Sequence, residues 1–106
     1  MNFRCVALSR EDDIAERARK IGKTTVRSIG DIARYQRLRD NDKETVSTKD
    51  LMEELRSDNR ELTRFLRLAH ETCENCNDVA TASLIENWSD QTERRTWFLR
   101  EIVNGL

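Results

Sequence analysis

The chain has 106 residues, 37% hydrophobic and 37% charged, with three glycines and no proline, and its formal net charge is −1. This length accommodates one domain, and the near-neutral charge argues against non-specific capture of nucleic acid through its phosphates. No apolar run approaches the roughly 20 residues that a bilayer-spanning helix needs, so the sequence excludes an integral membrane protein.

Residues 1–8 lack the pattern of a secretory signal, because their apolar part is short and an acidic cluster follows with no small-residue cleavage site. Three cysteines are an odd number, which disfavours a disulfide framework in a chain without an export signal. We therefore expect a cytoplasmic protein with reduced thiols.

Apolar positions recur at intervals of three and four along the chain and no strand pattern competes, so the sequence predicts an all-α protein. The first helix is expected over about Ser9–Ile21, with Ser9 as its cap and Gly22 as its stop. A second, shorter element is expected to open at Thr24 and Thr25 and to fade into a polar loop over residues 40–45.

Two long helices complete the prediction. Ser47, with an aspartate three residues later, marks the start of a helix over Thr48–Asn75. After a short polar break, Asn77 or Asp78 is expected to cap a helix that ends at Asn104. Two long helices joined by a short loop should lie antiparallel, as in a helical bundle. The two shorter pieces do not complete a four-helix bundle, so we expect apolar surface of the long helices to meet water.

The charges are segregated along the sequence. Residues 10–39 carry nine basic and five acidic side chains, whereas residues 40–93 carry six basic and fourteen acidic ones. Solvated helix faces with i,i+4 ion pairs, such as Asp13 with Arg17, account for this pattern. In a second interpretation, the acidic segment attracts cations to a pore or site of an assembly.

One candidate metal site is the pair Asp12 and Glu16. Their i,i+4 spacing puts two carboxylates on one helix face, close enough to hold one cation. Alternatively, the helix dipole favours acidic residues in a first turn, where they pair with Arg19 or Lys20.

His70, Cys73 and Cys76 form a second candidate, since a Cys-x-x-Cys motif raises zinc or redox chemistry. On a 3.6-residue period, however, His70 and Cys76 face different directions, and a structural zinc site needs a fourth ligand. Packing at the helix end is the alternative. There is also no glycine-rich phosphate loop and no serine elbow beside a histidine, which disfavours a hydrolase.

Three stretches of the sequence resemble the Dps family, the DNA-protection-during-starvation proteins or mini-ferritins. The first is the Asp-x-x-x-Glu of Asp12 and Glu16 in a helix that ends at Gly22, and the other two are residues 78–88 and 93–99. The resemblance implies a ferritin-like helical bundle, an iron(II)-oxidising activity and a hollow dodecameric shell.

Placed on that template, the chain is an incomplete bundle. It supplies the end of the second helix, a short connecting helix, and the long third and fourth helices, over residues 9–21, 29–38, 48–75 and 78–103 respectively. The first helix has no counterpart. We therefore predict a truncated Dps domain over residues 11–106 and an unmatched segment over residues 1–10.

The resemblance also implies a function. Dps proteins oxidise iron(II) with hydrogen peroxide and store iron(III), which protects DNA from oxidative damage. Asp12 and Glu16 match the family's carboxylate ligands and are the expected iron-binding and catalytic residues. The histidine ligands, which the family takes from the first helix of another subunit, have no match here, so truncation is expected to impair ferroxidase activity. The alternative is a non-catalytic helical remnant or interaction module that at most co-assembles with an intact paralogue.

Two further expectations follow from the template. Acidic residues at the junction of the third and fourth helices line pores in relatives, which makes Glu74 and Asp78 the pore candidates here. A lysine-rich tail, on which DNA binding in the family often depends, has no counterpart, so we expect no direct DNA binding and assign no nucleic-acid-binding residues.

Overall fold

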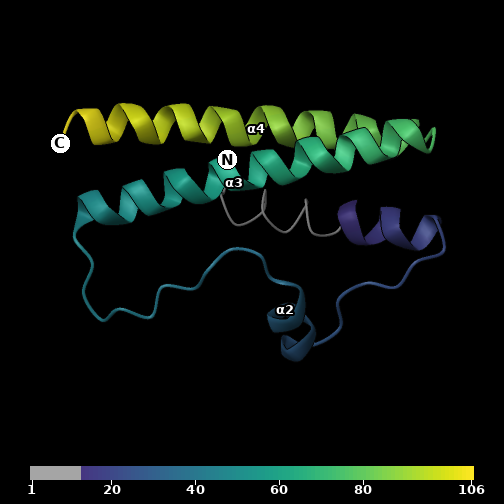
Figure 1. Ribbon diagram of the computed structural model, residues 1–106, viewed down its shortest axis with the longest axis horizontal. Coiled ribbons are helices and arrows are strands. Elements are labelled where there is room, and N and C mark those ends of the chain that lie inside the picture. The colour runs from purple at the N-terminus through teal and green to yellow at the C-terminus, as the bar shows by residue number, and fades with distance from the viewer. Residues whose placement is uncertain (1–12) are drawn as a thin grey trace. The chain divides into compact units, whose positions relative to one another are not determined.

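The computed structural model describes residues 13–106, and the chain divides into two compact units, Met1–Arg37 and Leu38–Leu106 (Figure 1). Every regular element in the described part is a helix, which confirms the all-α prediction. Among these helices, none combines the length and the apolar character needed to cross a membrane.

The first unit contains a helix over residues 13–20 that ends in a glycine turn. Gly22 has a φ of 82°, and the amides of Lys23 and Gly22 donate to the carbonyls of Ala18 and Arg19 at 2.9 and 3.0 Å. These two bonds form a Schellman motif, for which a residue with positive φ is required. The predicted stop at Gly22 is confirmed, whereas the predicted cap, Ser9, lies outside the described residues.

The second helix of this unit, α2 (Ile29–Tyr35), begins where the template places the short connecting helix and ends before residue 38, the end that the template gives. The prediction that it opens at Thr24 and Thr25 was wrong. Its cap is Ser28, whose hydroxyl accepts the amide of Asp31 at 3.1 Å, while the Asp31 carboxylate accepts the amide of Arg27 at 3.2 Å. This reciprocal pairing satisfies donors at the helix start and fixes where the helix begins.

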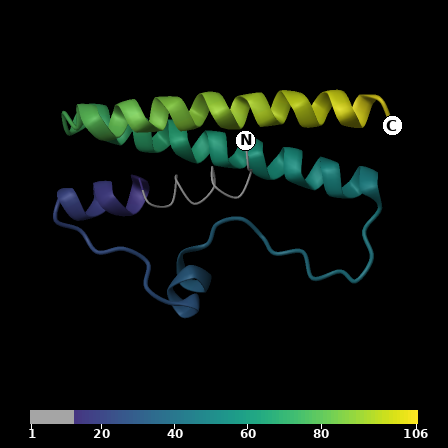
Figure 2. The ribbon, with the colours of Figure 1, turned by 180° about the vertical axis from the view of Figure 1, so that it is seen from behind.

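The second unit is built on two long helices, α3 (Thr48–Asn75) and α4 (Val79–Asn104). They run antiparallel and lie side by side along their length in both Figure 1 and Figure 2. The hydroxyl of Ser47 accepts the amide of Asp50 at 3.1 Å, so the predicted start of α3 is confirmed. Of the two cap candidates for α4, the cap is Asp78, whose carboxylate accepts the amide of Thr81 at 3.2 Å.

A tight turn joins α3 to α4. Asn77 has a φ of 59°, and the amides of Asp78 and Asn77 donate to the carbonyls of Cys73 and Glu74 at 2.8 and 3.1 Å. This is the same hydrogen-bond pattern as at Gly22, with asparagine, the residue that most readily replaces glycine there, in the left-handed position. The chain therefore reverses within three residues, and α4 returns along α3.

The two long helices meet along a seam of polar side chains. At its centre, the hydroxyl oxygens of Thr63 and Thr92 lie 2.6 Å apart, and these residues are only 6% and 1% exposed. Arg95 donates to the amide oxygen of Asn59 at 2.9 Å on one side of this pair. On the other side of the threonine pair, Arg67 pairs with Glu93 at 2.6 Å, and His70 pairs with Glu86 at 3.0 Å. Each bond joins α3 to α4, so together they define the register of the helix pair.

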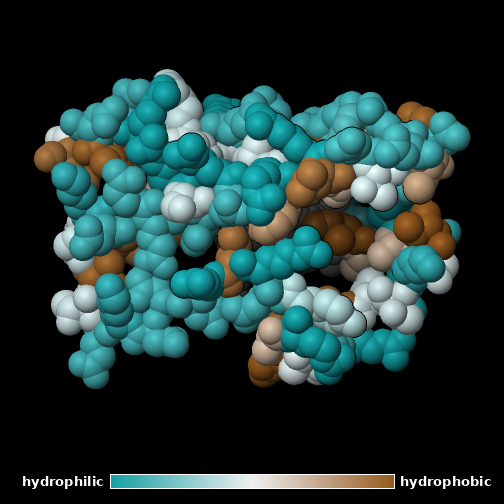
Figure 3. All heavy atoms as spheres, in the orientation of Figure 1, coloured by the Kyte–Doolittle hydropathy of each residue, from teal (hydrophilic) through white to brown (hydrophobic). Residues whose placement is uncertain are grey.

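The apolar core of the second unit is small. The buried apolar side chains in the described part are Ala82, Ile85 and Val103, all from α4. Leu55 of α3 and Phe98 of α4, by contrast, are 41% and 54% exposed. Apolar side chains accordingly reach the surface among hydrophilic ones (Figure 3). The expectation that the long helices leave apolar surface in water is confirmed.

The buried hydroxyl pair leads to a prediction for stability. Thr92→Val should lower the free energy of unfolding by about 1 kcal/mol, because it removes the bond to Thr63. The double variant Thr63→Val/Thr92→Val should lose less than the sum of the two single variants, since each single change already breaks the shared bond. Urea denaturation followed by circular dichroism measures both effects.

Thr72→Val is the matched control. Thr72 lies exposed on α3, and its hydroxyl donates only to the carbonyl of Leu68 in the preceding turn, at 3.2 Å. Its removal should change the free energy of unfolding by no more than about 0.5 kcal/mol. Strictly additive losses for Thr63 and Thr92 would show that their hydrogen bond does not couple the helices.

Candidate functional site

The predicted iron ligands belong to the first unit. Glu16 lies on the helix over residues 13–20 with its side chain exposed, whereas Asp12 lies outside the described residues. Within residues 13–106, no group of three or more His, Cys, Asp or Glu side chains could hold a metal ion. Further ligands for a metal at Glu16 would therefore lie outside residues 13–106 of this chain, and the carboxylate pair stays a prediction.

The predicted pore residues, Glu74 and Asp78, lie close together at the turn between α3 and α4. Both line one hollow of about 490 Å³, together with Cys73, Ser83 and Glu86. Besides the amide of Thr81, the Asp78 carboxylate accepts the hydroxyl of Thr81 at 2.6 Å, so this side chain is engaged in capping α4. Glu74 is exposed. Their role as pore residues depends on an assembly and stays a prediction.

His70 contacts carboxylates across the helix pair. Its Nε2 lies 3.0 Å from Glu86, and its Nδ1 lies 3.8 Å from Glu74. Cys73 is half-buried and Cys76 is exposed, and neither is in a disulfide. The backbone of Cys76 caps the end of α3. The histidine is thus positioned by the acidic residues of this hollow.

A second acidic group lies near the start of α3. Asn41, in the loop before this helix, donates to the carboxylate of Glu54 at 2.6 Å. One turn further on, the pKa of Asp58 is raised above its ordinary value, first by loss of water on burial and then by repulsion from Glu54. The charged form of Asp58 is therefore disfavoured in the folded protein.

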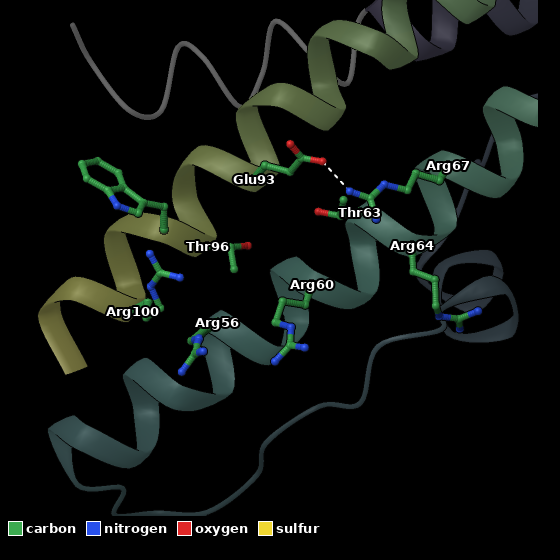
Figure 4. A pocket seen from close by; sticks show the side chains of 9 residues that line it. Arg56, Arg60, Thr63, Arg64, Arg67, Glu93, Thr96 and Arg100 are labelled. Atoms are coloured by element: carbon green, nitrogen blue, oxygen red, sulfur yellow. Dashed lines mark hydrogen bonds and ion pairs between the residues drawn. The ribbon is translucent and has the colours of Figure 1, made fainter. Parts of the chain in front are cut away.

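A strongly charged concave surface escaped the sequence analysis. It is a groove of about 580 Å³ between α3 and α4, which we call the arginine groove (Figure 4). Its lining residues come from both helices: Arg56, Arg60, Thr63, Arg64, Arg67, Glu93, Thr96, Trp97 and Arg100. The sequence contains a pattern that could have predicted the arginine groove: the four arginines of α3 recur at spacings of four, four and three, which places them along one side of a helix. The acidic excess of residues 40–93 masked that stripe.

Comparison with known families gives one match. The sequence matches the family described as ferritin-like domain over residues 9–106. No curated protein and no solved structure matched the chain.

The capping contacts of Asp78 lead to a second prediction. Asp78→Ala should lower the free energy of unfolding by about 1 kcal/mol, because the amide of Thr81 loses its acceptor. Asp78→Asn should lose much less, since an asparagine oxygen caps a helix about as well as aspartate. Urea denaturation measures the difference. Equal losses for the two variants would show that the charge of Asp78, rather than its cap, stabilises the turn.

The raised pKa of Asp58 leads to a third prediction. For a carboxyl whose folded pKa exceeds its unfolded pKa, the folded state binds the proton more tightly, so the group lowers stability above the folded pKa. Asp58→Asn should therefore raise the free energy of unfolding at neutral pH, by about 0.5 kcal/mol or less for a partly solvated site. The gain should shrink as pH falls through the folded pKa. Urea denaturation at neutral and acidic pH checks this, and a loss of stability at neutral pH would contradict it.

Proposed function

Because this chain belongs to the ferritin-like domain family, whose members generally bind iron, we propose that it acts in Dps-type iron metabolism. In this proposal, the chain binds iron(II), takes part in its oxidation by hydrogen peroxide and in the storage of iron(III), and so protects DNA from oxidative damage. Protection works through removal of iron(II) and peroxide, and not through direct DNA binding.

The observation that carries the proposal is the Asp-x-x-x-Glu motif within the matched region. Asp12 and Glu16 stand four residues apart in the sequence, and the helix over residues 13–20, which includes Glu16, is followed by the predicted turn at Gly22. Carboxylates and imidazoles are ligands that iron(II) accepts, so two carboxylates on one face supply half of a site. We assign Asp12 and Glu16 as the iron ligands.

In this proposal, the other half of the site comes from a second polypeptide. The only histidine of the sequence is His70, which contacts Glu86 and Glu74 on the long helices. We propose that the histidines are supplied across a subunit interface, by a ferritin-like partner that carries them, in a shell of the dodecameric kind. Glu74 and Asp78 then lie at the pores through which iron(II) enters.

The alternative function is a helical module without catalysis that joins the shell of an intact relative. The exposed apolar side chains of α3 and α4 favour an interaction surface of this kind. The two proposals share the assembly and differ in whether Asp12 and Glu16 contribute to iron oxidation.

Iron(II) oxidation in co-assembled shells tests the proposal. The chain is refolded together with an intact Dps protein, and the formation of iron(III) on addition of peroxide is followed by absorbance. Variants Asp12→Ala and Glu16→Ala should each reduce iron(II) affinity at the mixed sites by about tenfold or more, because each removes a ligand. The pure chain should oxidise iron(II) no faster than buffer.

Asp13→Ala is the matched control, because Asp13 is a neighbouring carboxylate outside the i,i+4 pair. It should leave iron(II) affinity unchanged within about twofold. Unchanged turnover after loss of Asp12 and Glu16 would favour the non-catalytic module. Rapid turnover by the pure chain would contradict the need for a partner's histidines.

A further inference from the structure

The arginine groove has the composition of an anion-binding site. Its lining contains five arginines and a single carboxylate, Glu93, so its charge is strongly positive although the chain as a whole is slightly acidic. Its volume of about 580 Å³ lies within the usual range for small-ligand sites, about 300–1,000 Å³. Guanidinium groups bind phosphate and carboxylate oxygens through paired N–H donors, so several of them together suit a multiply charged oxyanion.

Three of the arginines lie at one end of the groove. Figure 4 shows Arg56 and Arg60 of α3 in the same region as Arg100 of α4, whereas Arg67 pairs with Glu93 at the other end. Arg64 is held by Glu61 at 3.0 Å and lies over the ring of Phe65. The binding end of the groove is therefore formed by Arg56, Arg60 and Arg100.

These three arginines have N–H groups that are available to bind a ligand. The Nε atom of Arg56 is buried and has no hydrogen-bond partner among the described residues, which leaves one donor of this guanidinium unpaired. Arg56 and Arg100 contact carboxylates only at 3.6 Å, through Glu53 and Glu101. Exposed ion pairs of this kind contribute little, so a phosphate can replace them easily.

The spacing of the arginines favours a chain of phosphates over a single one. Arg56 and Arg60 are four residues apart on α3, a rise of about 6 Å, and Arg100 lies on the facing helix. A single tetrahedral anion cannot reach all three at hydrogen-bond distance as readily as linked phosphates can. Trp97, which also lines the groove and is 51% exposed, offers an aromatic surface beside it.

We propose that the arginine groove binds a linear phosphate chain, either inorganic polyphosphate or the triphosphate of a nucleotide. Arg56, Arg60 and Arg100 hold the phosphates. In the case of a nucleotide, the base packs against Trp97, as bases do on exposed aromatic side chains. The site involves neither Asp12 nor Glu16, so its existence does not depend on the iron chemistry proposed above.

Isothermal titration calorimetry of the full chain with inorganic tripolyphosphate, at low ionic strength, tests the site. Arg60→Ala and Arg100→Ala should each weaken binding by about tenfold or more, because each removes a charge-assisted pair of hydrogen bonds. Arg94→Ala is the matched control: Arg94 is an exposed arginine of α4 outside the groove, and its loss should change affinity by no more than about twofold. Circular dichroism checks that all variants keep their helices.

Titration with ATP distinguishes the two ligands. Tighter binding of ATP than of tripolyphosphate, with the difference removed by Trp97→Ala, identifies a nucleotide site. Equal binding of the two identifies a site for the phosphate chain alone. Equal affinity for orthophosphate and tripolyphosphate, equal losses in the Arg60 and Arg94 variants, or no binding by the unaltered chain at millimolar ligand would each overturn the proposal.

Discussion

The hydrogen bond between the buried hydroxyls of Thr63 and Thr92 determines how the two long helices of the second unit fit together. A purely apolar seam tolerates small sliding motions, because apolar contacts are not directional. A hydroxyl pair is directional, since displacement by one turn would break its bond and leave each hydroxyl only the carbonyl of Asn59 or Ser89 in its own helix. Hydrogen bonds on either side of this pair, between Asn59 and Arg95 and between His70 and Glu86, form in the same register of the two helices.

Local signals in the sequence predicted most of the helix boundaries. Ser47 and Gly22 act through hydrogen bonds to neighbouring residues, so their effect does not depend on the rest of the fold. The start of α2 was misjudged, because Thr24 and Thr25 are β-branched and favour extended backbone, whereas Ser28 has an aspartate three residues later to complete the cap. In each case the outcome follows from which side chain can accept a backbone N–H.

A candidate site could likewise be predicted from the sequence only where its residues are close together in the chain. Asp12 and Glu16 are only four residues apart in the sequence, so the sequence alone is sufficient to propose this pair. The arginine groove requires two helices, because Arg100 meets Arg56 and Arg60 only once α4 has returned along α3. Averaging charge over residues 40–93 also hid the arginines among more numerous acidic residues. A charge count along the chain cannot show which side chains share a surface.

The polar seam also separates the two sides of the helix pair. At 3.6 residues per turn, Arg60 and Arg64 lie to one side of Thr63, and Leu62 and Leu66 lie to the other. A substitution on the leucine side alters what the helices pack against, and one on the arginine side alters the charge of the groove, while the seam between them holds the register. Substitutions on the two sides therefore have separate effects, with the pairing of Thr63 and Thr92 as the constraint that both sides share.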